Sequence, residues 1–160
     1  APTPLNVPDD VLESIAKNGV IVMFNFYPGF LSREGAKDVH LFCEYYLKLK
    51  NDPRIDEPEL NKLLDKFMED HPVPECSVER VVDHIDHIVK IAGIDHAGLG
   101  SDFDGISYTP DYLKDVSFFP YITQVLLNRG YKEADINKIL GGNFLRVFRM
   151  AEEKAFHSPG

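Results

Sequence analysis

The sequence predicts an α/β fold that is part of a larger unit. Two apolar segments, GVIVMFNFY at 19–27 and HAGLGSD at 96–102, have the composition of strands covered on both faces. Helical patterns separate them, and strands that are joined by helices pair in parallel through right-handed crossovers. Because a sheet of two parallel strands leaves both edges unpaired, we expect another segment to complete it.

The composition of the 160 residues is that of an ordinary globular protein, with 44% hydrophobic and 27% charged residues. The formal net charge is −9 and no segment is rich in lysine and arginine, which argues against nucleic acid and anionic membranes as partners. No apolar run approaches the ~20 residues of a transmembrane helix, and the first residues, APTPLNVPDD, lack the features of a signal peptide. Cys43 and Cys76 follow no CxxC pattern; free thiols favour a cytoplasmic location, and a single disulfide is the alternative.

Apolar residues at helical spacing predict helices before, between and after the two strands. The first helix follows Asn6, a candidate N-cap, and ends at Gly19. The helix that precedes the second strand begins at Ser77, ends at Gly93 and has a continuous apolar face. In chain order, the predicted helices cover 6–19, 34–51, 57–71, 77–93, 118–129, 132–140 and 143–156.

The candidate functional residues follow the two strands, because functional groups of parallel α/β folds lie at the carboxyl ends of strands. The first strand runs into NFYPGF, with Asn25, Tyr27 and Phe30, and the second into SDFDG, with Asp102 and Asp104. A carboxylate at such an end can act as a general base, hold a metal or orient a bound water. We expect a functional role for Asp102, with loop capping as the alternative, and a turn-forming role for Asp104.

The histidines form no metal motif. His84 and His87 in DHIDHI are three residues apart, whereas zinc-binding helices typically place histidines four apart with a glutamate between them. His87 lies nearly opposite the apolar face of its helix and His84 lies at the margin of that face, so we expect a solvated helix face or one that only supports a nearby site. The residues therefore include no cluster of histidines and carboxylates that could hold a metal by itself, and no nucleophile elbow.

Three segments together resemble successive blocks of the membrane (renal) dipeptidase family, whose members are zinc-dependent dipeptidases with a (β/α)8 barrel. They are NVPDDVLESIAKNGVIVMFNFYPGFLS at 6–32, SVERVVDHIDHIVKIAGIDHAGLGSDFDGI at 77–106 and LKDVSFFPYITQVLLNRGYKEADINKILGGNFLRVF at 113–148. The resemblance implies that residues 1–160 are the C-terminal part of a single metal-dependent hydrolase barrel. The two strands would be barrel strands seven and eight, and residues 32–76 would be a helical insertion.

The resemblance also implies a role for particular residues. Asp102 matches the strand-eight aspartate, which in the family lies beside a zinc-bridging water, contacts the substrate's amino end and passes a proton to the leaving amine. Tyr27, Phe30 and Asp102 would therefore bind a small dipeptide. In the family, the ligands of the two zinc ions lie on earlier strands, so no metal ligand is expected in this chain. The N-terminal part of the barrel is an expected partner, and a homodimer is one option.

Two positions depart from the family pattern. Leu5 stands where members usually have an arginine that meets the dipeptide's carboxylate, and Phe30 stands where some have a tyrosine. Three interpretations stay open. The chain is part of a metallo-dipeptidase and is inactive when isolated, or it is a non-catalytic truncated module or interaction fragment, or it belongs to a related hydrolase with a non-dipeptide amide substrate.

Overall fold

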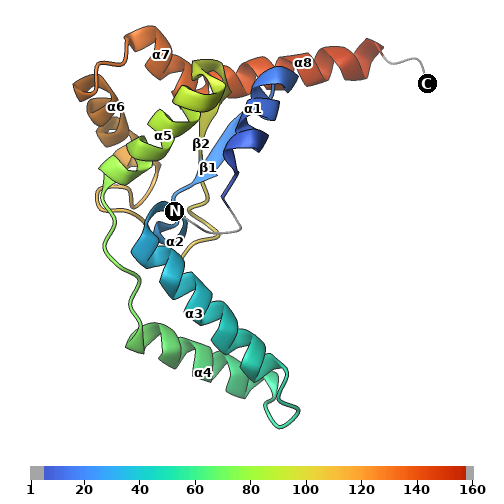
Figure 1. Ribbon diagram of the computed structural model, residues 1–160, viewed down its shortest axis with the longest axis vertical. Coiled ribbons are helices and arrows are strands. Elements are labelled where there is room, and N and C mark those ends of the chain that lie inside the picture. The colour runs from blue at the N-terminus through green and yellow to red at the C-terminus, as the bar shows by residue number, and fades with distance from the viewer. Residues whose placement is uncertain (1–5, 158–160) are drawn as a thin grey trace.

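A computed structural model describes residues 6–157, which form a small parallel sheet with helices packed against it (Figure 1). The fold is α/β and mostly helical, and this part of the prediction is confirmed. The helices and strands are α1 (Asp9–Asn18), β1 (Val22–Asn25), α2 (Pro28–Leu31), α3 (Arg33–Lys50), α4 (Glu57–Asp70), α5 (Val78–Ala92), β2 (Ala97–Ser101), α6 (Phe119–Asn128), α7 (Glu133–Asn137) and α8 (Asn143–His157).

The sheet consists of β1 and β2, which pair in parallel as predicted. Val22 lies opposite Ala97, and an irregularity after Phe24 brings Asn25 opposite Ser101. Both strands are shorter than the apolar segments that predicted them. A strand extends only as far as it is hydrogen-bonded to a neighbouring strand, and each of these strands has a single partner strand among residues 6–157. Their carboxyl ends therefore lie side by side, and their outer edges are unpaired within the described part of the chain.

The core lies between the sheet and α5. Val81, Val82 and Ile85 on α5 have no exposed surface, as their helical spacing predicted. Such a side chain contributes about 1.5–3 kcal/mol to folding when it is fully buried. Helices α1 and α6 both pack on α5, and their residues Leu12 and Ile122 belong to this core.

The starts of α1 and α8 are fixed by different contacts, and the start of α1 differs from the prediction. Asn6 does not cap α1, since its side chain donates to the Phe30 carbonyl at 2.9 Å and Pro8 occupies the N-cap position. Asn143, the first residue of α8, is buried, and its amide donates to the carbonyls of Ile94 and Ala97 at 2.7 and 2.9 Å. Asn143 thus ties α8 to the start of β2.

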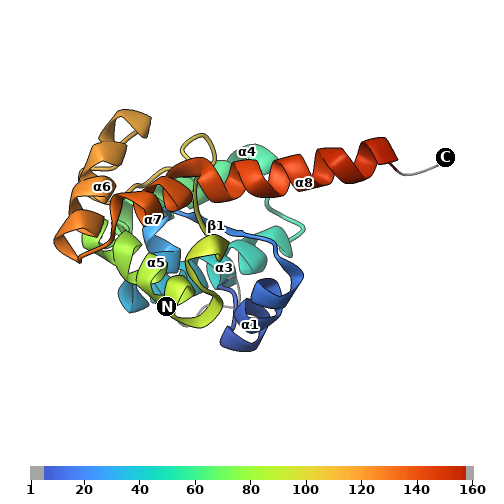
Figure 2. The ribbon, with the colours of Figure 1, turned by 90° about the horizontal axis from the view of Figure 1, so that it is seen from above.

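Two parts of the chain extend away from the sheet. The hairpin of α3 and α4 projects at one end (Figure 1), and α8 runs past the sheet and beyond the other helices (Figure 2). Both hairpin helices are N-capped by a side chain. The Ser32 hydroxyl oxygen accepts from the Gly35 N–H at 2.9 Å, and the Asp56 carboxylate accepts from the Glu59 N–H at 3.0 Å. Both helices lie within 32–76, whose identity as an insertion stays a prediction. None of the helices in residues 6–157 has the length and apolar character needed to cross a membrane.

Candidate active site

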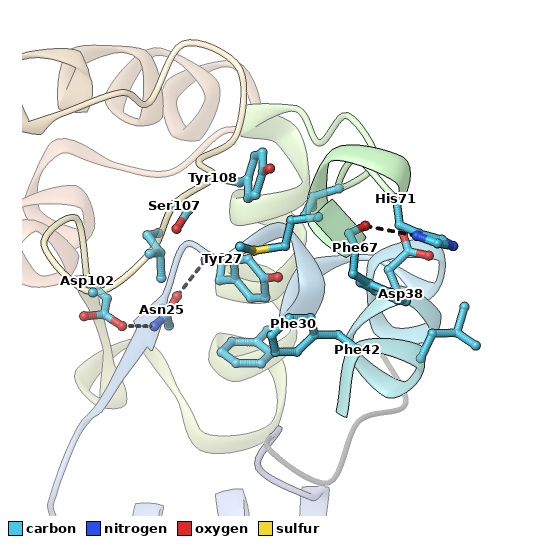
Figure 3. Close-up of a pocket in the computed structure, with 15 residues that line it drawn as sticks. Asn25, Tyr27, Phe30, Asp38, Phe42, Phe67, His71, Asp102, Ser107 and Tyr108 are labelled. Atoms are coloured by element: carbon cyan, nitrogen blue, oxygen red, sulfur yellow. Dashed lines mark hydrogen bonds between the residues drawn. The ribbon is translucent and has the colours of Figure 1, made fainter. Parts of the chain in front are cut away.

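The carboxyl ends of β1 and β2 bring Asn25 and Asp102 together (Figure 3). The Asn25 Nδ2 donates to Asp102 Oδ2 at 2.6 Å, and the Tyr27 backbone N–H donates to Asn25 Oδ1 at 2.6 Å. Because a backbone N–H can only donate, the oxygen of Asn25 must face Tyr27 and its amino group must face Asp102. Asn25 therefore holds one carboxylate oxygen of Asp102 in place.

The backbone at the end of β2 adopts an unusual conformation. Ser101 and Asp102 have φ values of 48° and 71°, in the left-handed region that aspartate tolerates better than most residues. The Gly105 N–H donates to the Asp102 carbonyl at 3.0 Å, and a Cβ on Gly105 would lie 2.4 Å from Asp102 Oδ1. The backbone of Asp102 and Gly105 therefore closes a turn, and glycine at 105 leaves room for the carboxylate. The turn-forming role of Asp104 stays a prediction. Left-handed non-glycine residues of this kind cluster at functional sites.

A pocket of about 330 Å³ opens beside Asp102 and reaches the α3–α4 hairpin (Figure 3). Asp102 and Asn25 lie at one end of it, and aromatic rings from the hairpin lie at the other. A concave site with an apolar wall and a few polar groups is typical of small-molecule binding. The lining residues are Asn25, Tyr27, Phe30, Asp38, Leu41, Phe42, Phe67, Met68, His71, Val73, Asp102, Gly105, Ile106, Ser107 and Tyr108.

The charged groups of the pocket are acidic. Asp38 and Asp102 line it, and no lysine or arginine does so among residues 6–157. Burial raises the pKa of the Tyr27 hydroxyl above its usual 10.0, and the neighbouring Tyr108 and Asp38 raise it further. Tyr27 is therefore a neutral hydrogen-bonding group at physiological pH, and the pocket favours a ligand with a cationic group near a carboxylate.

The residues predicted from the strand ends meet in this pocket. Asp102, Tyr27 and Phe30 all line it, and the rings of Tyr27 and Phe30 pack edge to face with centroids 5.2 Å apart. Their catalytic and substrate-binding roles stay predictions. Leu5, which stands where family members usually have a carboxylate-binding arginine, lies outside the described residues.

Sequence reasoning missed the residues that the hairpin contributes, among them Asp38, Phe67 and His71. The spacing within α3 and α4 predicts helices, but it carries no signal for how the hairpin folds back towards the strand ends. Tyr108 also lines the pocket, and its place three residues after the SDFDG segment is the one sequence signal that points to it.

Three histidines outside the pocket have hydrogen-bonding partners within the fold. A ring nitrogen of His84 lies 3.2 Å from the Leu31 carbonyl, and one of His87 lies 2.7 Å from the Asp9 carboxylate. His96 lies 2.6 Å from a backbone carbonyl at the amino end of the sheet. Burial of His84 lowers the pKa of its ring. His84 is therefore half-buried against α2, while His87 lies on an exposed face, as predicted.

The described residues do not fit a metal ion on their own. Among residues 6–157, no three or more histidine, cysteine, aspartate or glutamate side chains come together as ligands. Asp102 has Asn25 as its nearest polar partner, and Asn25 is held by a backbone N–H. The expectation that another segment of the barrel supplies the metal ligands stays a prediction.

A parallel sheet with an oriented carboxylate at its carboxyl end, facing a pocket, defines an α/β protein with an enzyme-like site. Comparison with known families narrows the class of protein. The model of the membrane dipeptidases (peptidase family M19) matches residues 1–159. The chain belongs to the membrane dipeptidase family.

Individual relatives agree with this assignment. The chain is 32% identical over 156 residues to Dipeptidase 3 of Mus musculus. The aligned region covers 98% of the chain and 24% of that protein. It resembles the probable dipeptidase PvdM of Pseudomonas aeruginosa with a TM-score of 0.69 and 29% identity, over 88% of the chain and 39% of that structure. It also resembles a metallo peptidase of Rhodobacter sphaeroides, solved with a phosphinate mimic of the dipeptide L-Ala-D-Ala, with a TM-score of 0.61 and 26% identity, over 89% and 31%. The chain thus spans less than half of each of these relatives.

Proposed function

We propose that this chain is the C-terminal part of a metal-dependent dipeptidase, with β1 and β2 as strands seven and eight of a (β/α)8 barrel. Membership of the membrane dipeptidase family supports this, as do the shares of 24% and 39% that the chain covers of two relatives. The unpaired outer edges of β1 and β2 within residues 6–157 are the places where further barrel strands would pair.

The single observation that carries the proposal is the position of Asp102. Its carboxylate lies at the carboxyl end of β2, is held by Asn25 at 2.6 Å and faces the pocket. A carboxylate in this place can accept a proton from the attacking water and deliver it to the nitrogen of the leaving amine as the C–N bond breaks. Asp102 is the catalytic residue of this chain in the proposal, and it also pairs with the substrate's protonated amino group.

The substrate is a small dipeptide, and Tyr27 and Phe30 would form the wall of the pocket beside it. Ligands for two zinc ions belong, in this proposal, to the N-terminal part of the barrel, because the described residues do not form a metal site. The chain alone would then supply a proton-transfer group and a pocket, and would not hydrolyse dipeptides by itself.

Replacement of Asp102 in the complete enzyme tests the proposal. The variant Asp102→Asn keeps the shape of the side chain and removes its basicity, so we expect kcat to fall by about 10²–10⁴-fold. Metal content, measured by mass spectrometry of the purified enzyme, should not change. The matched control is Asp104→Asn, two residues away in the same turn and outside the pocket lining, which should retain kcat. Unchanged turnover of Asp102→Asn would remove Asp102 from the mechanism.

A further inference from the structure

We propose that the α3–α4 hairpin forms a subsite for a large apolar side chain on the N-terminal residue of the substrate. This subsite rests on the proposed function, which places the substrate's amino group at Asp102. The side chain of that residue branches from the carbon next to the amine, so it enters whatever part of the pocket continues beyond Asp102. In the structure, that part ends on the hairpin (Figure 3).

Side chains of both hairpin helices line the pocket. Leu41 and Phe42 come from α3, and Phe67 and Met68 come from α4. Phe42, Phe67 and Met68 are half-buried, so part of their apolar surface faces the pocket. Burial of this surface by a substrate side chain would contribute about 25 cal/mol per Å².

The aromatic wall is held in place by ring contacts within the hairpin. Phe67 stacks on Tyr45 and on His71, with ring centroids 4.6 and 4.1 Å apart, and it meets Phe42 at 6.0 Å. A wall that is already ordered loses little conformational freedom when a ligand binds. The cluster is therefore suited to recognise a side chain, in addition to joining α3 to α4.

Helix α4 has the apolar stripe of a buried helix but no buried residue. The spacing of Leu60, Leu63 and Leu64 continues to Phe67 and Met68, and all five side chains are half-buried. The last two line the pocket, and both keep part of their surface exposed although Phe67 also contacts α3. An amphipathic helix normally buries its apolar stripe, and in this structure the end of the stripe faces the space that the substrate would occupy.

Charge narrows the class of side chain. Asp38 and Asp102 line the pocket without a lysine or arginine among residues 6–157, which disfavours an acidic side chain. The apolar wall disfavours a small side chain, which would leave it exposed to water. The class that fits is a dipeptide whose N-terminal residue is phenylalanine, leucine or methionine.

The experiment measures kcat/KM of the complete enzyme for Phe-Gly, Leu-Gly, Gly-Gly, Lys-Gly and Asp-Gly. We expect Phe-Gly and Leu-Gly to exceed Gly-Gly and Asp-Gly by about 10-fold or more, as an apolar subsite discriminates by such factors. They should also exceed Lys-Gly, because an ammonium group loses hydration against the apolar wall. Phe42→Ala should lower kcat/KM for Phe-Gly by about 10- to 100-fold and leave Gly-Gly within about 3-fold. Phe42→Leu should lower it less. The ratio of kcat/KM for Phe-Gly to kcat/KM for Gly-Gly, measured on one preparation, does not depend on the fraction of enzyme that is folded.

Tyr46→Ala is the matched control, because Tyr46 is an aromatic residue of α3 that does not line the pocket and bonds to Lys50. It should leave the ratio of Phe-Gly to Gly-Gly unchanged. Equal kcat/KM for all five dipeptides, a preference for Lys-Gly, or an equal loss for both substrates in Phe42→Ala would overturn the subsite. Absence of hydrolysis of every dipeptide would instead overturn the proposed function.

Discussion

Asn25 is the residue on which the orientation of Asp102 depends. Its amide donates to the carboxylate at 2.6 Å and is itself fixed by the Tyr27 N–H at 2.6 Å. A hydrogen bond to a charged group contributes about 1.5–3 kcal/mol, so Asn25→Ala should lower kcat of the complete enzyme by about 10- to 100-fold. Asn25→Asp keeps the shape but sets a second carboxylate against Asp102, and should be more damaging.

The control is Asn128→Ala, which removes an exposed amide that bonds only to Gln124 among the described contacts and lies outside the pocket lining. A crystal structure of the Asn25→Ala enzyme should show Asp102 in another rotamer. An Asn25→Ala enzyme with unchanged kcat would show that Asp102 needs no positioning residue.

At this scale the sequence predicts which residues meet, and only in part how they meet. Asn25 and Asp102 follow apolar strands, and parallel strands carry their carboxyl ends to one edge, so their proximity follows from the pattern. The irregularity that sets Asn25 opposite Ser101 and the left-handed φ values of Ser101 and Asp102 depend on the finished ladder. No local pattern encodes them.

Helix α5 contains a half-buried titratable group, His84, whose effect on stability can be measured. Burial lowers the pKa of His84 below its usual 6.5, although the bond to the Leu31 carbonyl opposes this. The unfolded chain binds a proton near pH 6.5, while the folded chain binds it only at lower pH. The contribution of His84 to the free energy of unfolding is therefore complete above pH 6.5 and is lost as the pH falls below it.

Urea unfolding at pH 7.5, 6.5 and 5.5 checks this. Wild type should lose more stability between pH 6.5 and 5.5 than His84→Gln, by at most about 1.4 kcal/mol per pH unit for one proton. The comparison of the two proteins cancels the titration of the other groups. Parallel pH dependence of wild type and variant would contradict the prediction. Because His84 lies outside the lining of the pocket beside Asp102, the same variant should retain kcat in the complete enzyme.

Elements with a clear period and clear ends could be predicted well. The face of α5 with Val81, Val82 and Ile85 follows from helical spacing, and Gly19 and Gly93 end their helices. The strands are shorter than predicted, because apolar composition shows where a strand can form and a partner decides how far it extends. The packing of α4 on α3 depends on contacts of Phe67 across the hairpin, which spacing within either helix does not specify.

At the scale of the whole molecule, the two-stranded sheet is the feature that needs explanation. Parallel sheets are normally covered on both faces and have more than two strands, yet β1 and β2 pair only with each other among residues 6–157. Two strands separated by helices indicate a parallel α/β unit, but they cannot indicate how many strands close it. The barrel is therefore implied by the resemblance to a family and not by the pattern of the residues, and it stays a proposal.

The metal content of the 160-residue chain separates the competing interpretations at this scale. Among the described residues, no three side chains of the ligating types come together, and the carboxylates of the pocket are Asp38 and Asp102. We expect the purified chain, after dialysis, to retain well below one zinc ion, and the complete enzyme to retain two. Mass spectrometry of metal content beside the intact mass measures both, and Asp102→Asn should change neither value. Two zinc ions on the lone chain would place the ligands within it and overturn the division of the active site between two segments. A complete enzyme without bound metal would instead favour a non-catalytic module, in which the carboxylate held by Asn25 serves binding alone.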